Sequence, residues 1–121
     1  MNDNGEFFPL WGICQGFEYL AMFAADAGDA VLTKLESHDV SIPIKFEVDP
    51  EKTKMFHAAG KDAKLYEETP SAFMSHTWGI DPKKFETDKG LAKMFTMTST
   101  SYDCIHDSTF VSSMESPDYP F

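Results

Sequence analysis

The sequence predicts an α/β fold in a single domain over residues 1–121. The first observation is the apolar run 7–13, which ends in the pattern Gly12-x-Cys14-x-Gly16 and passes at once into a helical periodicity. A strand that turns sharply into a helix around one raised side chain has this pattern. The second observation is the composition, because 121 residues with 42% hydrophobic residues and eleven Phe can bury one small core.

The turn at Cys14 explains the two glycines beside it. Such a turn forces its central residue into a strained backbone conformation. The neighbouring backbone then passes so close that Gly12 and Gly16 are expected to have no room for a Cβ atom. The helix that follows is predicted over 15–25. One face of it carries apolar residues at i, i+3, i+4 and i+7, namely Phe17, Leu20, Ala21 and Ala24.

This geometry gives Cys14 the properties of a nucleophile. The N-terminus of the helix would point at its sulfur, and the partial positive charge there favours the thiolate form. The backbone N–H of Gln15 would supply one half of an oxyanion hole. The alternative is that Cys14 is a small buried residue between two unrelated glycines, as free cysteines usually are. The combination of strand, motif and helix favours a cysteine hydrolase or amidotransferase.

Two strands and a helix are predicted next. The strands are expected over 31–37 and 41–48, and Pro43 inside the second indicates an edge or a bulge. Asp49 is followed by proline and glutamate, a favourable helix start, and the helix is expected to run to Gly60.

The second half of the chain is predicted as a short helical turn, a strand, a helix and a hairpin. Asp81-Pro82 reads as a turn before the helix, which Thr87 would cap. The hairpin strands are rich in Thr, Ser and Val. The tail 116–121 is expected to end without closure. The ranges are 61–68 for the helical turn, 73–80 for the strand, 87–95 for the helix, and 96–104 with 109–115 for the hairpin.

Composition excludes several classes of function. The net charge is −10, and all ten basic residues are lysines, which argues against nucleic-acid binding. Without arginine, a substrate carboxylate would have to be held by lysine or by backbone donors. Cys14 and Cys104 make no disulfide framework. No run is long enough to span a membrane, and the first six residues are no signal peptide. The ligand spacings predict no metal site, and no cofactor is expected.

The four histidines differ in their claim to a functional role. His38 is expected on the surface between two strands, His57 on a helix surface, and His106 exposed in the hairpin turn. His76 lies on the strand predicted over 73–80, beside aromatic residues. A position facing a cleft and a purely structural role are about equally plausible for His76.

The chain resembles the γ-glutamyl hydrolase (folate γ-glutamyl hydrolase) family, which has the class I glutamine amidotransferase-like fold. The resemblance rests on residues 4–18 (NGEFFPLWGICQGFE), on 72–73 (AF) with 75–80 (SHTWGI), and on Met114-Glu115 with Tyr119-Pro120. It implies a partial, flavodoxin-like three-layer sheet with flanking helices, lacking the first strands and the last strand. The chain would be a single partial domain, with the exposed edges of an incomplete parallel sheet.

The resemblance also implies an activity. Cys14 would be the nucleophile that attacks the γ-glutamyl amide of a polyglutamylated folate or a similar peptide. His76 matches a histidine that lines the family's substrate cleft, and Glu18 matches an acid on the helix after the nucleophile. The loop that gives the second oxyanion donor would precede this chain, and the catalytic histidine would follow Phe121.

Two functions stay open on this basis. One is a γ-glutamyl hydrolase seen in part. The other is a catalytically inactive fragment that serves as a structural or assembly component. Either would need a partner chain, a homodimer mate or the missing segments to cover its exposed sheet edges. Family resemblance implies a lysosomal, vacuolar or secreted location.

Overall fold

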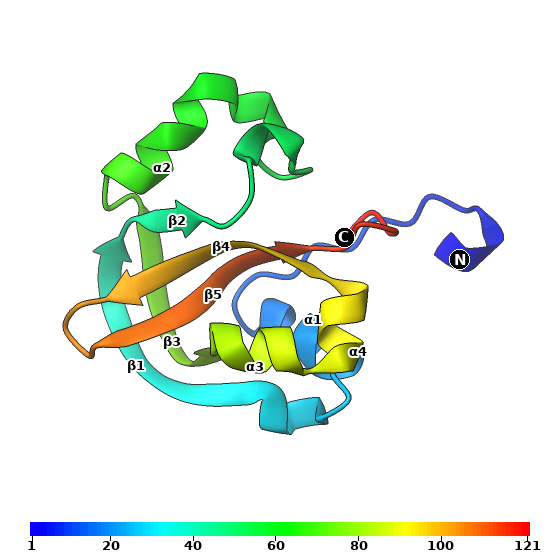
Figure 1. Ribbon diagram of the computed structural model, residues 1–121, viewed down its shortest axis with the longest axis horizontal. Helices are drawn as coiled ribbons and strands as arrows, with labels where there is room; N and C mark the ends of the chain where they lie inside the picture. Colours follow the sequence, from blue (N-terminus) through cyan, green and yellow to red (C-terminus); the bar gives the residue numbers. More distant parts are fainter.

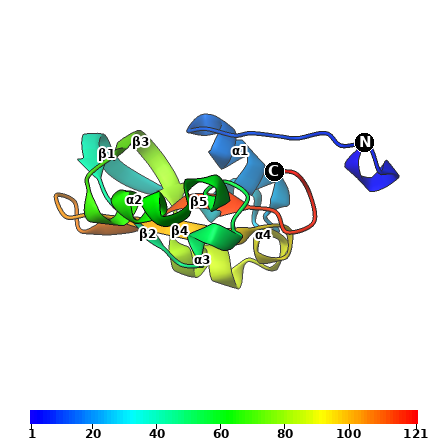
Figure 2. The ribbon, with the colours of Figure 1, turned by 90° about the horizontal axis from the view of Figure 1, so that it is seen from above.

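The computed structural model describes residues 1–121 as a mixed α/β molecule, so the predicted α/β class is confirmed. The strands form two small sheets, one with the order β1-β3 and one with the order β2-β4-β5. The short helices around α2 lie on one side of the β4–β5 hairpin, and α3 and α4 lie on the other (Figures 1 and 2). No helix is both long and apolar enough to cross a membrane.

Groups of helices alternate with single strands or pairs of strands along the chain. The α-helices are α1 (Gln15–Ala24), α2 (Leu65–Glu68), α3 (Pro82–Thr87) and α4 (Lys89–Met94). The 3-10 helices are η1 (Asn2–Asn4), η2 (Gly28–Val31), η3 (Pro50–Lys52) and η4 (His57–Lys64). The strands are β1 (Leu32–Ile42), β2 (Ile44–Phe46), β3 (Ala72–Ile80), β4 (Thr96–Asp103) and β5 (Ser108–Glu115).

Pro43 divides the two sheets. β1 pairs with β3, and β2 pairs with β4, so the chain leaves one sheet and enters the other at this residue. Proline has no N–H to donate to a ladder, which suits it to such a break. The boundary between the two strands was expected near residue 38 and lies five residues later. All three strand pairs are antiparallel, whereas the resemblance implied parallel pairing.

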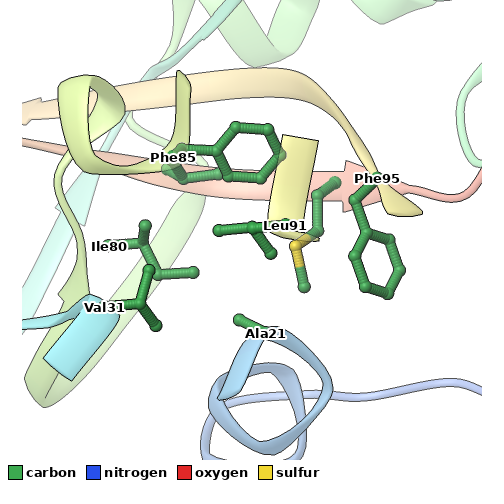
Figure 3. Close-up of a cluster of buried hydrophobic side chains, with 8 residues drawn as sticks. Ala21, Val31, Ile80, Phe85, Leu91 and Phe95 are labelled. Carbon is green, nitrogen blue, oxygen red and sulfur yellow. The ribbon is translucent and has the colours of Figure 1, made fainter. Parts of the chain in front are cut away.

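The main core lies where α1, α3 and α4 meet β3 and β5. Figure 3 shows the side chains of this cluster pointing toward one another. The apolar face predicted for α1 is confirmed, because Ala21 is fully buried and Phe17, Leu20 and Ala24 pack against the cluster. The eight buried residues are Ala21, Val31, Ile80, Phe85, Leu91, Phe95, Val111 and Met114.

The segment 7–13 is the main correction to the predicted elements. It forms no strand, and Phe7, Trp11 and Ile13 are 82%, 68% and 72% exposed. Its one backbone hydrogen bond to another part of the fold runs from the Leu10 N–H to the Pro120 carbonyl, at 3.3 Å. The apolar run signals burial, but no neighbouring strand is present to pair with it.

Two helices also differ from their predicted form. The helix expected from Asp49 to Gly60 is only the single turn η3 followed by η4. The side chain of Asp49 caps η3 by accepting a hydrogen bond from the Glu51 N–H. The helix expected over 87–95 is shorter and begins after Asp88 rather than Thr87. Asp88 caps this helix by accepting a hydrogen bond from the Leu91 N–H. Its carboxylate is also held in place by the N–H groups of Asp26 and Ala27, which donate to it at 2.9 and 3.0 Å.

The hairpin of β4 and β5 and the strand β3 are confirmed. The tail was expected to stop without any helical or turn closure, and it forms neither a helix nor a turn, but other contacts fix its end. The Ser116 N–H donates to the Phe121 carbonyl at 2.5 Å, and the Phe121 ring packs edge-on against Phe95. The tail therefore returns to the core beside the segment 7–13.

Candidate functional site

Cys14 lies at the N-cap of α1, in a backbone conformation that residues other than glycine rarely adopt. Its φ is 55° and its ψ is −117°. A non-glycine residue held there costs on the order of 1–3 kcal/mol and occurs mostly at functional sites. Gln15 is the first helical residue, as predicted. The Gly16 N–H donates to the Ile13 carbonyl and the Glu18 N–H to the Cys14 carbonyl, while the Gln15 N–H makes no hydrogen bond.

The two glycines of the motif have different roles. A Cβ atom on Gly12 would lie 2.6 Å from the Gly16 carbonyl oxygen and 2.7 Å from Leu20 Cδ1. A Cβ atom on Gly16 would have no atom within 4 Å. The expected lack of space is thus correct for Gly12 and wrong for Gly16. Gly16 supplies the backbone that Gly12 approaches, and its own side has open space.

Cys14, Glu18 and His76, the residues that the sequence predicts to act in a site, line one cavity of about 1220 Å³. Its walls come from the segment 7–20, the stretch 54–56, β3, β5 and the tail. Of its 34 lining residues 21 are hydrophobic. Both tryptophans of the chain, Trp11 and Trp78, also line it.

His76 packs against an aromatic ring next to β1. It stands opposite Ser37 in the β1–β3 ladder, and its ring meets the Phe110 ring edge-on at 4.8 Å. Its Nδ1 is buried without a hydrogen-bond partner. Burial lowers the pKa of His76 below its usual value, which favours the neutral imidazole. No hydrogen bond joins His76 to Cys14, so the two share a cavity without forming a nucleophile–base pair.

Glu18 lies in the first turn of α1 and is half-buried. Burial raises the pKa of its carboxyl group, because the apolar surroundings solvate the charged form poorly. Its position near the helix N-terminus acts in the opposite direction by stabilising negative charge. A carboxylate in this position can accept a hydrogen bond from a ligand.

The other histidines lie away from this cavity. His38 is exposed inside β1 rather than between strands, and exposed His57 contacts the Lys54 carbonyl through Nδ1 at 3.0 Å. His106 lies in the hairpin turn as expected, but it is not a free surface side chain. Its Nδ1 is 2.8 Å from Oδ2 of Asp103, which is fully buried.

Asp103 is the centre of a polar cluster that the sequence does not reveal. Its carboxylate accepts hydrogen bonds from Ser37 Oγ at 2.6 Å and from the Ile105 N–H at 2.9 Å, besides His106. These donors hold the pKa of Asp103 far below its usual range. The spacing of Asp103 and His106 across a turn is a local signal, but Ser37 is 66 residues distant in the chain.

Lys54 is a further lining residue of the cavity that no motif singles out. Both cysteines, Cys14 and Cys104, are free and exposed. Cys104 does not line the cavity of Cys14. No group of three or more His, Cys, Asp or Glu side chains is arranged to hold a metal ion.

Known proteins with a similar sequence are γ-glutamyl hydrolases. The chain is 33% identical over 121 residues to the γ-glutamyl hydrolase of Mus musculus, covering 98% of this chain and 36% of that protein. It is 32% identical over 121 residues to γ-glutamyl hydrolase B of Dictyostelium discoideum, covering 99% and 34%. It is 31% identical over 119 residues to the Homo sapiens γ-glutamyl hydrolase, covering 98% and 36%.

The chain spans about a third of the length of these curated relatives. No protein-family model matches it. The relatives come from mammals, an amoeba and a plant, and all eight carry the name γ-glutamyl hydrolase in one form or another. The resemblance to the γ-glutamyl hydrolase family that the motifs predict is therefore confirmed over nearly the whole of this chain.

Proposed function

We propose that this chain carries the nucleophile of a γ-glutamyl hydrolase, a cysteine peptidase that cleaves the γ-glutamyl bonds of polyglutamates such as polyglutamylated folates. The observation that carries the proposal is the geometry at Cys14. Cys14 is the N-cap residue of α1 and has a positive φ, and it lines a cavity large enough for a peptide. The names of the relatives supply the class of bond.

The proposed chemistry starts with attack by Cys14 Sγ on the γ-carbonyl carbon of the substrate. The carbonyl oxygen becomes an oxyanion, and the unused N–H of Gln15 would donate to it. Collapse of this intermediate releases the amine of the leaving glutamate and leaves a thioester on Cys14. Water then hydrolyses the thioester and frees the γ-carboxylate.

His76 and Glu18 are proposed to bind the substrate. The leaving amine must receive a proton from a group within hydrogen-bond reach of the reacting atoms. His76 is neutral by virtue of its burial and makes no hydrogen bond to Cys14, so it is a poor candidate for that task. We propose that a histidine outside these 121 residues supplies the proton and that His76 contacts the substrate instead.

The first test is selective labelling of Cys14. A γ-glutamyl diazoketone, which alkylates a thiolate positioned at a γ-carbonyl, should modify Cys14 and spare the equally exposed Cys104. Peptide mass spectrometry reads the site, and γ-glutamylglutamate should protect Cys14 from the reagent. Equal labelling of both cysteines, or no protection, would contradict the proposal.

A second test separates binding of substrate from turnover. We expect the 121-residue chain to lack steady-state hydrolysis of γ-glutamylglutamate, because loss of a base or an oxyanion donor costs on the order of a hundredfold or more in rate. A version extended by the remaining segments of a relative should turn over. Equal turnover by the two would show that a histidine inside this chain is the base.

The alternative, an inactive assembly component, is favoured by one observation. The segment 7–13 before the nucleophile is apolar, exposed and unpaired. We propose that a partner chain, a homodimer mate or additional segments cover this surface in the functional protein. A location in the lysosome, in the vacuole or outside the cell stays a prediction of the family resemblance.

A further inference from the structure

The cavity beside Cys14 has one lysine in its lining, Lys54, and the chain contains no arginine. The Lys54 ammonium group donates to the main-chain carbonyls of Ser116 and Tyr119, the latter at 2.6 Å. These two carbonyls belong to the tail that forms part of the same cavity wall. The cation is therefore held at the rim of the cavity by neutral acceptors.

No carboxylate forms an ion pair with this ammonium group, although Glu18, Glu115 and Asp118 also line the cavity. The four ion pairs of the molecule involve other side chains. Glu115 lies close by, but its carboxylate accepts the backbone N–H of Lys54, at 2.8 and 3.0 Å, and that of Met55 at 3.4 Å. An ammonium group has three N–H donors, and the two carbonyls use two of them. One donor and a whole positive charge remain available.

We propose that Lys54 is the carboxylate-binding residue of this cavity and fixes a carboxylate of the residue that follows the γ-glutamyl bond of a ligand. The assignment of the ligand rests on the proposed function, whereas the anion site rests on the contacts of Lys54 alone. A polyglutamate carries several negative charges, and the molecule carries a net charge of −10, so a local cation is needed to draw the ligand in.

The two carbonyl contacts make Lys54 suited to this role. A free lysine side chain loses much rotamer freedom when it binds an anion. Lys54 is already ordered by its contacts to the tail, so less of that cost remains to be met on binding.

The experiment compares two ligands that differ only in charge. γ-Glutamylglutamate and the same dipeptide with both carboxyls of its second residue converted to amides are titrated into the full chain. Fluorescence of Trp11 and Trp78, which line the cavity, reports binding. We expect the wild-type chain to bind the acid about tenfold more tightly than the diamide, as for a hydrogen bond to a charged group.

Lys54→Met should remove this preference, so that the two dipeptides bind with similar affinity. Lys54→Gln retains a donor for the tail carbonyls without the charge, and it should also lose the preference while keeping the fold. Lys52→Met is the matched control, because Lys52 is exposed, pairs with Asp49 and lies outside the cavity lining. It should retain the preference of the wild-type chain.

Three results would overturn the proposal. They are a wild-type chain that binds both dipeptides equally or binds neither, a Lys54 variant that keeps the preference, and a Lys52 variant that loses it. If Lys54 had a purely structural role, its replacement would weaken the binding of both dipeptides by the same factor. Failure of Cys14 labelling with an intact Lys54-dependent preference would instead contradict the hydrolase and leave the anion site standing.

Discussion

At the scale of single residues, the site depends on how closely two backbone segments approach at the start of α1. Cys14 holds a positive φ because the chain must reverse within one residue between Ile13 and Gln15. Its strain is maintained by the helix that follows and by the contact of Gly12 with the Gly16 carbonyl. Gly12 is therefore the residue whose replacement should disturb the conformation of Cys14 most directly.

Gly12→Ala should lower the free energy of unfolding by about 1–3 kcal/mol, because its Cβ would overlap the Gly16 carbonyl and the Leu20 side chain. Gly16→Ala is the matched control, since open space surrounds its Cβ and alanine favours the helix by up to about 1 kcal/mol. Urea unfolding measures both, and diazoketone labelling of Cys14 should slow in the first variant only. Equal stability of the two variants would contradict the close approach.

At the scale of elements, the molecule is held together by polar groups that reach between segments far apart in sequence. Asp88 caps α4 and also accepts N–H groups from the loop after α1. Lys84 of α3 donates to the carbonyls of Ala30 in η2 and of Leu32 at the start of β1. Asp103 at the end of β4 binds Ser37 of β1. Each contact positions one element against another without a shared ladder.

These contacts explain which elements could be predicted from sequence. The helix α1, the strand β3 and the β4–β5 hairpin follow from local periodicity and turn residues, which are written in consecutive positions. The cap at Asp88 could not be predicted, because its further partners lie about 60 residues earlier. The same holds for Ser37 and Asp103, and for Lys54, whose carbonyl partners lie in the tail.

The segment 7–13 shows the opposite limit. Its apolar residues predict a buried strand, and this prediction is wrong, because a strand requires a neighbour and none of the five strands pairs with the segment. The site residues were predictable where a motif fixes them, as at Cys14 and Gln15. The shared cavity of Cys14 and His76 depends on how β3 lies beside α1, which no local pattern encodes.

Asp103→Asn should lower the free energy of unfolding at pH 7 by about 1–3 kcal/mol, because it weakens charge-assisted hydrogen bonds to Ser37 and His106. The carboxyl has a depressed pKa in the folded state, so its contribution is present above the unfolded value near 3.8 and is lost as the pH falls below it. The stability difference between wild type and variant should therefore shrink between about pH 5 and pH 2.

Urea unfolding at a series of pH values tests this expectation. Asp62→Asn is the control, because Asp62 is exposed and its carboxylate makes no hydrogen bond or ion pair. It should change stability little at any pH. A pH-independent difference for Asp103→Asn would mean that the native carboxylate is not selectively stabilised.

At the scale of the whole molecule, two surface properties oppose each other. The net charge of −10 keeps copies of the chain apart in solution. The exposed apolar residues of the segment 7–13, together with Phe73 and Trp78 of β3, favour contact with another apolar surface. Which property dominates depends on salt, because about 0.1 M salt reduces the range of charge repulsion to about 10 Å.

We expect the chain to associate reversibly as salt rises from about 0.01 to 0.5 M, since the screening length falls severalfold while the apolar contact is unaffected. The double variant Phe7→Ser, Ile13→Ser should stay monomeric over the same range, at little cost in stability, because both side chains are already 82% and 72% exposed. Phe23→Ser removes an equally exposed ring that does not line the cavity, and it should associate like the wild type.

Sedimentation velocity at several protein concentrations distinguishes these outcomes. A wild-type chain that is monomeric throughout would mean that the segment before Cys14 needs no covering partner. Association abolished by Phe23→Ser would move the contact surface from this segment to the outer face of α1.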